Sequence, residues 1–341
     1  GITALAVVLF LLAYIFFLRR QVVSPILTIA GEARRFAVDN VARLDLLEQI
    51  RKKDEIGTLA RAIGKMETDI VQYVENLTAV TAEKERIGAE LNVATQIQAD
   101  MLPRIFPPFP ERDEFDIYAT MTPAREVGGD FYDFFLVDAD HLAVVIADVS
   151  GKGVPAALFM VIAKTLIKNH AQTGMEPGKV FETVNNQLCE NNEAGMFVTA
   201  FLGILELSTG RFTYVNAGHN PPLAALDGQL YDWLPSKRGF VLAGLEDMRY
   251  RQQEIVLRPG DRVFLYTDGI TEALDPTGRL YSEARLKAFF NESEPEDGPL
   301  DEQLALLHQD IAAFAGGAEQ ADDITMLLLR INTDYRRDEN G

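Results

Sequence analysis

The sequence contains little cysteine and no excess of positive charge, and each shortage excludes a class of function. Cys189 is the single cysteine among 341 residues, so no internal disulfide can form and no CxxC pair suggests zinc. The formal net charge is −19, which argues against nucleic acid as a partner. Residues 1–104 hold 13 basic and 13 acidic residues, so the whole imbalance falls in residues 105–341. A domain this acidic is either simply soluble or gathers its acids around a cation.

The first residues form a long apolar run, ITALAVVLFLLAYIFFL from Ile2 to Leu18. Its length is near the lower end of the roughly 17–25 residues that span a bilayer. No charged n-region or A-x-A-like site accompanies it, as a signal peptide would require. Because the sequence does not begin with Met, we expect residues 1–18 to be the end of a longer transmembrane helix. Arg19 and Arg20 follow at once, so the positive-inside rule places the rest of the chain on the cytoplasmic side of an inner membrane.

Two helical patterns follow the apolar run. The first has Ser24 as its N-cap and Pro25 in its first turn. The second begins near Asp54, and its apolar residues recur at alternating steps of three and four, which is the spacing of a coiled-coil seam. A single amphipathic helix on a globular core would have a wider apolar stripe. The seam residues are Ile56, Leu59, Ile63, Met66, Ile70, Tyr73, Leu77 and Val80.

Residues 19–77 resemble a HAMP domain, with a Pro-initiated helix, a connector and a heptad helix that opens with DEIG. The resemblance implies a homodimer with a parallel four-helix bundle that passes signals from membrane to effector. Residues 78–104 continue the heptads, with polar interruptions at Lys84 and Gln98, and predict a coiled-coil signalling helix. The helix ends before Pro103, and residues 105–113 form a Pro-rich linker.

From residue 114 onward the pattern changes to eight short strands rich in β-branched and aromatic residues, bounded by Gly, Asp, Asn or Pro. Two predicted helices, at residues 155–170 and 177–190, lie together between the third and fourth strands. Later helices are expected near residues 282–290 and 300–314. Runs of strands with grouped helices favour an α+β domain over alternating βαβ units. We place this domain at residues 114–331, followed by a tail of residues 332–341.

Acidic residues mark the ends of several predicted strands. Asp130 follows two glycines in VGGDFYD, Asp148 ends LAVVIAD, Asp268 ends VFLYTD, and Asp322 and Asp323 open the last strand. An acid beside glycine is also an ordinary turn residue. Acids that converge at one edge of a sheet would repel one another, however, and so imply a cation. All-oxygen ligation suits Mg²⁺ or Mn²⁺, and two such ions would activate a water for attack on a phosphate.

Other motif interpretations fail on single residues. A GGDEF cyclase loop needs Glu where Phe131 stands, and the GKG of residues 151–153 lacks the spacing and Ser/Thr of a Walker loop. An EF-hand beginning at Asp148 would need an acidic ligand where Phe159 stands. The helix after the HAMP-like segment has no phospho-accepting His, which argues against a histidine kinase.

Six motifs, VGGDFYD, ADVSGKGVPAALFM, FVTAFLGILE, NAGHNPPL, YTDGITEA and ADDITMLLL, occur in this order. Together they resemble the metal-dependent serine/threonine phosphatases of the PPM type, in the bacterial SpoIIE/RsbU branch. The resemblance covers about residues 114–331. It implies a two-sheet β-sandwich flanked by helix pairs and a binuclear Mn²⁺/Mg²⁺ site that hydrolyses phosphoserine or phosphothreonine.

Carried onto this sequence, the resemblance assigns the metal ligands as catalytic residues. Asp130 and Asp148 would hold the ions, with Asp148 bridging them, and Asp268 and Asp322 would complete the site. The backbone carbonyl of Val149 would also ligate, where the family often has Gly.

Four further residues are weaker candidates. Arg125 is near the cluster in sequence and would pair with the substrate phosphate, or would be a solvated loop residue. His219 would protonate a leaving alkoxide or, as a turn residue, fix the backbone before two prolines. Asp133, which faces the other side of its strand, and Asp323, second to Asp322, are expected to support the ligands without binding the ions.

The sequence therefore predicts a membrane-anchored, dimeric, signal-regulated protein phosphatase. By resemblance, its substrate would be a phosphorylated STAS-domain protein that antagonises an anti-sigma factor. A catalytically silent module that uses the same fold to sequester a partner is the alternative. For regulation, we expect residues 91–102 to dock on the phosphatase domain against the helix after Asp148.

Overall fold

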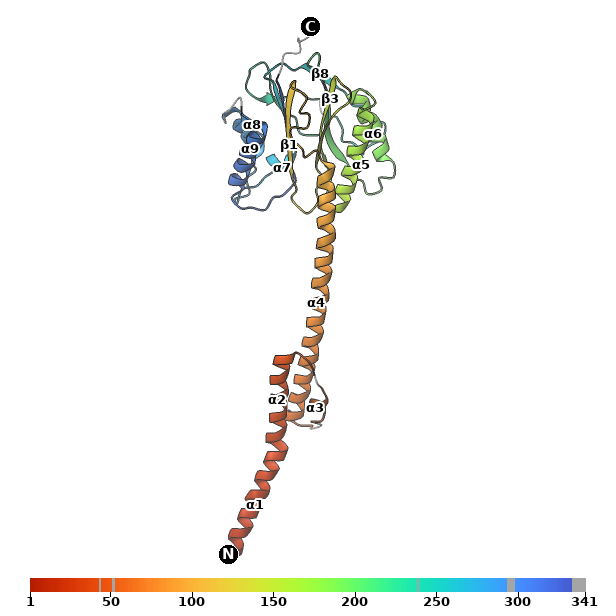
Figure 1. Cartoon of the computed structure of the whole chain (residues 1–341). Helices are drawn as coiled ribbons and strands as arrows, with labels where there is room; N and C mark the ends of the chain where they lie inside the picture. Colours follow the sequence, from red (N-terminus) through yellow and green to blue (C-terminus); the bar gives the residue numbers. More distant parts are fainter. Residues whose placement is uncertain (43, 51–52, 238, 293–297, 333–341) are drawn as a thin grey trace. The chain divides into compact units, whose positions relative to one another are not determined.

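The computed structural model describes residues 1–42, 44–50, 53–237, 239–292 and 298–332. The chain divides into two compact units, residues 1–90 and residues 91–341, and Figure 1 colours them along the sequence. The long helix α4 (Glu55–Met101) begins in the first unit, and its residues from Leu91 onward belong to the second.

The first unit begins with a continuous helical run of residues 2–39. It consists of α1 (Ile2–Leu18), the π-helical stretch η1 (Arg19–Val23) and α2 (Ser24–Asp39). Its most apolar 18-residue window has a mean hydropathy of 2.4 and no buried residue, so this run is long and apolar enough to cross a membrane. Asn40 ends α2 in a left-handed conformation, as a C-cap residue commonly does.

A small apolar cluster holds the rest of the first unit together. Ile29 of α2, Leu47 of α3 (Leu44–Glu48) and Ala60 of α4 are buried together, and Ile56 and Ile63 pack against them. Two of the eight predicted seam residues, Ile56 and Ile63, therefore pack within the first unit, and the other six are exposed.

The second unit contains two five-stranded antiparallel sheets, which confirms the expected β-sandwich. The first sheet has the order β1 (Phe115–Thr122), β10 (Ile324–Ile331), β9 (Arg262–Tyr266), β6 (Leu223–Ala225) and β7 (Asp232–Trp233). The second has the order β2 (Phe131–Leu136), β3 (His141–Val149), β4 (Val198–Glu206), β5 (Arg211–Ala217) and β8 (Gln253–Val256).

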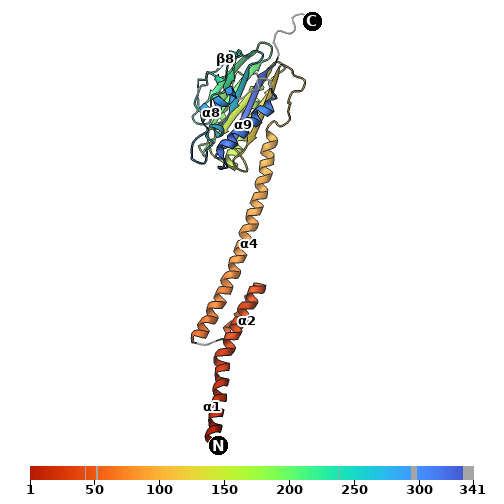
Figure 2. The ribbon, with the colours of Figure 1, turned by 90° about the vertical axis from the view of Figure 1, so that its left-hand side faces the viewer.

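Helix pairs cover the outer faces of the two sheets. Figure 1 shows α5 (Val154–Ala171) and α6 (Pro177–Cys189) on the side of β3, and α8 (Ser282–Glu292) and α9 (Leu300–Ala315) on the side of β1. Figure 2 shows α8 and α9 in front of the strands. Each sheet is thus covered by helices on its outer face and by the other sheet on its inner face. This explains why the sequences of the strands are nearly continuous apolar runs.

Alternation along the strands divides the core into two layers. Leu327 and Leu329 of β10 belong to the cluster between the sheets, whereas Met326 and Leu328 belong to the cluster under α8 and α9. Successive side chains on a strand point to opposite faces, so a single strand supplies both layers.

The Pro-rich segment is packed against the sandwich. Phe106 lies 4.5 Å from Tyr118 and Phe109 lies 5.8 Å from Phe115, measured between ring centroids.

The sequence predicted the eight longer strands, but not the short β6 and β7 or the four-residue helix α7 (Asp268–Thr271). These elements are too short for any periodicity to reveal them.

Candidate metal centre

The acids singled out in the sequence come together from both sheets. Asp130 immediately precedes β2 and Asp148 lies near the end of β3, both in the second sheet. Asp268 opens α7, shortly after the end of β9, and Asp322 lies shortly before β10. Strands β9 and β10 belong to the first sheet. The sequence suggested convergence at the edge of a single sheet. The structure instead places the acids across the gap between two sheets, because each sheet supplies strands that end there.

Mutual repulsion and burial shift the titration of these carboxyls. Burial, together with the charges of Asp268 and Asp322, raises the pKa of Asp148 to about 7. Burial, then Glu272 and Asp322, raise the pKa of Asp268 to about 6, and the charge of Lys152 opposes this rise. The cluster is therefore short of positive charge, which is the condition that a bound cation relieves.

Asp130 is the most deeply buried of the acids. Burial first, and then the charges of Asp148 and Asp323, raise its pKa well above the ordinary value. Its Oδ2 accepts hydrogen bonds from the hydroxyls of Thr267 at 2.6 Å and Thr325 at 2.7 Å. Both threonines are buried. They orient the carboxylate, and no local pattern in the sequence indicates this role beyond their place next to acidic motifs.

Close backbone approach explains two glycines of the motifs. A Cβ on Gly129 would lie 2.8 Å from the carbonyl oxygen of Val149, the predicted backbone ligand. A Cβ on Gly269 would overlap the backbone carbonyl of Asp323. Any larger residue would push apart the segments that carry the acids.

Asp323 anchors the loop before Asp130. Its Oδ1 accepts from the N–H of Ala124 at 2.8 Å, and its Oδ2 accepts from the N–H of Gly129 at 2.8 Å and more weakly from that of Asp130 at 3.4 Å. This carboxylate is buried and occupied by backbone donors, a geometry that suits the supporting role we expect for it.

Asp133 and His219 are both engaged away from the acids. Asp133 is buried and pairs with Lys164 at 2.7 Å and Lys168 at 3.8 Å, which ties β2 to α5. The Nε2–H of His219 donates to the carbonyl of Tyr266 at 3.1 Å, and its Nδ1 accepts from the Thr199 hydroxyl at 2.9 Å. With both nitrogens occupied, this histidine suits the turn-fixing role better than that of a general acid.

Arg125 is exposed, and among the residues that the structure describes it has no ion-pair partner. The last turns of α4, in contrast, contact the same loop directly. The side chain of Gln98 hydrogen-bonds both backbone groups of Gly128, and the hydroxyl of Thr95 donates to the carbonyl of Glu126. Thr95 and Gln98 thus bond the loop before Asp130, and docking of residues 91–102 against the helix after Asp148 stays a prediction.

The donor set fits a hard divalent cation. Within the described part of the chain, no three acidic, histidine or cysteine side chains close around one point as a ready-made cage. Mg²⁺ and similar ions do not need one, since they keep several waters and take one or two carboxylates. A positive charge already contacts the cluster, because the Lys152 ammonium lies 2.9 Å from Asp322 Oδ2. All the donors are oxygens, so the residues fit Mg²⁺ or Mn²⁺ and not zinc.

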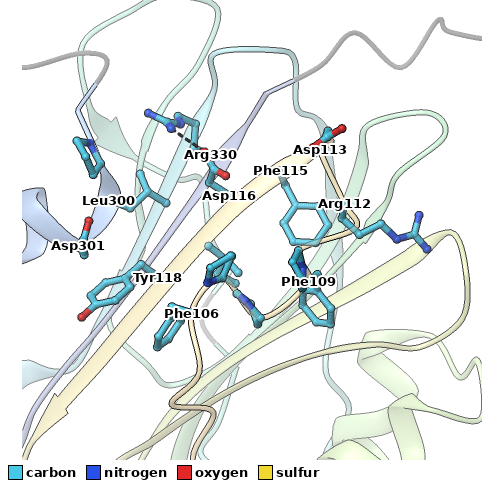
Figure 3. Close-up of a pocket in the computed structure, with 15 residues that line it drawn as sticks. Phe106, Phe109, Arg112, Asp113, Phe115, Asp116, Tyr118, Leu300, Asp301 and Arg330 are labelled. Atoms are coloured by element: carbon cyan, nitrogen blue, oxygen red, sulfur yellow. Dashed lines mark hydrogen bonds and ion pairs between the residues drawn. The ribbon is translucent and has the colours of Figure 1, made fainter.

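A large cavity lies elsewhere on the second unit. It measures about 580 Å³ and lies between the Pro-rich segment, β1 and the start of α9. Figure 3 shows Phe106, Phe109 and Tyr118 along it, with Arg330 paired to Asp116. None of the candidate metal ligands lines it, so this cavity is distinct from the acid cluster.

Comparison with known proteins decides the family. The sequence pattern of the family described as Stage II sporulation protein E (SpoIIE) matches residues 138–332, more than half of the chain. The chain belongs to the SpoIIE family. The matched range contains Asp148, Asp268 and Asp322 and begins after Asp130.

Named relatives of this SpoIIE-family chain include two curated proteins. It is 33% identical to the phosphoserine phosphatase RsbU of Bacillus subtilis over 61% of each protein. It is 28% identical to protein IcfG of Synechocystis over 90% of this chain and 51% of that protein. The chain thus spans between one half and two thirds of the length of these relatives.

Among solved structures, the SiaA-PP2C domain of Pseudomonas aeruginosa is similar, with a TM-score of 0.64 and 25% identity. The match covers 74% of this chain and 99% of that domain. The phosphatase domain and regulatory fragment of SpoIIE from Bacillus subtilis matches with a TM-score of 0.55 and 19% identity over 64% of this chain. The SpoIIE-family unit of this chain therefore has the PP2C fold.

Proposed function

We propose that this chain is a metal-dependent protein serine/threonine phosphatase that is anchored in a membrane and regulated by a signal. One observation carries the proposal: acids from two sheets of a PP2C-type sandwich come together, and burial together with the charges of Asp268 and Asp322 raises the pKa of Asp148 to about 7. Such a cluster favours the binding of cations, and hard cations bound next to a phosphomonoester promote hydrolysis of the ester.

We assign the ligand roles by position. Asp148 is coupled to Asp130 on its own sheet and to Asp268 and Asp322 from the other, so it is our candidate for the bridging ligand. Asp130, Asp268, Asp322 and the Val149 carbonyl would complete the set. Two Mn²⁺ or Mg²⁺ ions would supply Lewis acidity at the phosphoryl oxygens and a lowered pKa for a nearby water.

The chain's own residues would hold this site in order. The Thr267 and Thr325 hydroxyls fix Asp130, and Asp323 fixes the loop that carries it. These supporting groups are buried, so their positions need no rearrangement when substrate arrives. Preorganised ligands of this kind keep a metal site within the narrow geometry that catalysis needs.

We propose that a second copy of the chain covers the exposed part of the heptad seam. Leu59, Met66, Tyr73 and Leu77 are exposed large apolar residues on one long helix. Their spacing is that of a coiled-coil seam, and a parallel partner helix would bury them. This supports the HAMP-like dimer and the coiled-coil helix, with α1 in the bilayer and Arg19 and Arg20 on its cytoplasmic side.

For the substrate, we propose a phosphorylated STAS-domain protein that antagonises an anti-sigma factor. Support comes from the family membership and from the relative RsbU, which is named a phosphoserine phosphatase.

The orientation of the chain in the membrane is tested separately by cysteine labelling from each side of the membrane, after replacement of Cys189. A periplasmic label on the second unit would exclude a cytoplasmic phosphoprotein as substrate.

Phosphate release tests the central proposal. The full chain in detergent micelles is incubated with phosphoserine-containing candidate proteins and with a generic aryl phosphate. We expect release with Mn²⁺ or Mg²⁺ and none with EDTA. Stable binding of a phosphoprotein with no release of phosphate from any substrate would favour the alternative, a silent binding module.

A further inference from the structure

We propose that Lys152 binds the phosphoryl group of the substrate, after divalent cations displace its ammonium from Asp322. The inference rests on the phosphatase function proposed above and adds a substrate-binding residue that the motif comparison did not single out. Among the described residues, Lys152 is the basic side chain that forms an ion pair with an acid of the cluster, at 2.9 Å from Asp322 Oδ2. It also donates to the carbonyl of Ala321.

The loop that carries Lys152 is a tight turn from which the lysine side chain extends. Lys152 lies between Gly151 and Gly153, whose φ angles of 88° and 79° are in the left-handed region that glycine adopts easily. This tight turn joins the end of β3, with Asp148 and Val149, to the start of α5. A Cβ added at either glycine would have no heavy atom within 4 Å outside the adjoining residues. The turn therefore lies in open space, and the lysine has room to change its direction.

Lys152 is exposed, with 38% of its side chain accessible, and its ammonium contacts Asp322, whose side chain is 36% exposed. Both side chains therefore lie on the solvent side of the cluster, from which a phosphorylated protein would approach. Lysine serves widely as a phosphate-binding residue because its ammonium is a compact charge with three rotatable donors.

The bound substrate would add negative charge to the site. The four candidate ligands, when ionised, would balance two divalent ions. Asp323 and a phosphomonoester, which carries about two negative charges, would then leave the site net negative, and a further positive charge would offset part of this excess. Lys152 supplies this charge at the mouth of the cluster.

Occupation of the cluster by divalent ions would also release the lysine. Asp322 Oδ2 accepts from the Lys152 ammonium, and Asp322 is also a predicted metal ligand. This oxygen cannot bind the ammonium and a metal ion strongly at the same time. Repulsion between like charges at this distance then favours an outward orientation of the side chain. The same ammonium thus neutralises Asp322 in the metal-free protein and becomes available to the phosphate in the loaded one.

Arg125 is the rival candidate for this role. It is exposed, and no acid of the cluster pairs with it among the residues described. Lys152, by contrast, already touches a candidate ligand. The two residues make different predictions for variants, so one series of measurements separates them.

The test measures binding of inorganic phosphate to the Mn²⁺-loaded full chain by calorimetry, at saturating Mn²⁺. We expect Lys152→Gln to weaken phosphate binding by roughly tenfold to a hundredfold, the usual cost of a lost charge-assisted hydrogen bond. Lys152→Arg should keep affinity within a few-fold, since guanidinium also binds phosphate. Mn²⁺ affinity of Lys152→Gln should stay equal or rise, because the competing ammonium is gone.

Lys168→Gln is the matched control. Lys168 has a similar exposure, 37%, and its acidic partner Asp133 keeps Lys164 after the substitution. Phosphate affinity equal in Lys152→Gln and Lys168→Gln would overturn the proposal, and so would a larger loss in Arg125→Gln. A fall in Mn²⁺ affinity alongside phosphate affinity would also overturn it, because the lysine would then act on the metal site.

Turnover is recorded in parallel. If the wild-type chain binds phosphate through Lys152 but hydrolyses no phosphoprotein, the phosphatase function fails while the binding residue stands. If hydrolysis proceeds and Lys152→Gln leaves KM unchanged, the function stands and the lysine assignment fails.

Discussion

The side chain of Gln98 holds Gly128 by both of its backbone groups. Its Nε2 donates to the Gly128 carbonyl at 2.6 Å, and its Oε1 accepts from the Gly128 N–H at 3.1 Å. Gly128 stands two residues before Asp130, a candidate metal ligand. In the sequence, Gln98 was an interruption of the apolar seam. In the structure it is buried, and its polarity is explained by this contact between the end of α4 and the loop of the acid cluster.

Removal of this contact should weaken both the second unit and its metal site. In Gln98→Ala, two buried backbone groups lose their partner, which should lower the free energy of unfolding by about 1–3 kcal/mol. Mn²⁺ affinity should fall as well, because the loop before Asp130 is released. Gln96→Ala is the control, since Gln96 is exposed and bonds only Asp100 of its own helix in the contacts described. Calorimetric Mn²⁺ titration checks the prediction, and equal affinities in the two variants would contradict it.

Asp148→Asn should abolish turnover and leave the fold intact. The acid lies at the centre of the coupled cluster, so its loss removes the candidate bridging ligand. Because the substitution also removes one of several mutually repelling charges, the metal-free variant should be at least as stable as the wild type. Asp247→Asn, at an exposed turn where Asn also tolerates φ 58°, should behave as the wild type. Retention of normal phosphate release in Asp148→Asn would refute the metal assignment.

The metal-free protein should lose stability as pH rises from about 4 through 7. Burial and neighbouring acids raise the pKa of Asp148 to about 7 and that of Asp268 to about 6. A carboxyl whose folded-state pKa is raised contributes stability that is complete below its unfolded pKa and disappears above the folded one. The loss should be on the order of 1–4 kcal/mol.

Fluorescence of Trp233, the single tryptophan, reports this unfolding because it lies in β7 of the sandwich. Melting temperatures in EDTA should fall between pH 5 and pH 8, and less so in Asp148→Asn. Saturating Mn²⁺ should suppress the fall. A melting temperature that rises over this range in both proteins would show that other groups dominate.

Loss of the threonine hydroxyls should weaken the metal site without removing a ligand. Thr267→Val and Thr325→Val each take one donor from Asp130 Oδ2. Loss of such a supporting contact typically costs roughly tenfold to a hundredfold in metal affinity or activity. Thr183→Val is the control, because the Thr183 hydroxyl bonds a carbonyl of its own helix. Equal Mn²⁺ affinity in all three variants would remove the positioning role.

The sequence by itself determined the elements and the chemistry of this protein. Apolar runs bounded by turn residues predicted the eight longer strands, and prolines placed several helices within a few residues. The expected N-cap at Ser24 was wrong, because Ser24 lies inside the continuous helical run of residues 2–39. The acids at strand ends indicated hard divalent cations, and six ordered motifs indicated the family that the comparison confirmed. These signals are local, since periodicity, turn chemistry and residue type act over a few positions.

Only the tertiary structure decided how these pieces meet. Thr267 and Thr325 reach Asp130 across 137 and 195 positions of the chain, and Gln98 reaches Gly128 across 30. Two sheets, not one edge, supply the acids. Such contacts depend on which strands pair and how the sheets face each other, and packing sets these relations over the whole domain. A local pattern can name a carboxylate as a ligand, but the folded sandwich decides which hydroxyls and which lysine stand beside it.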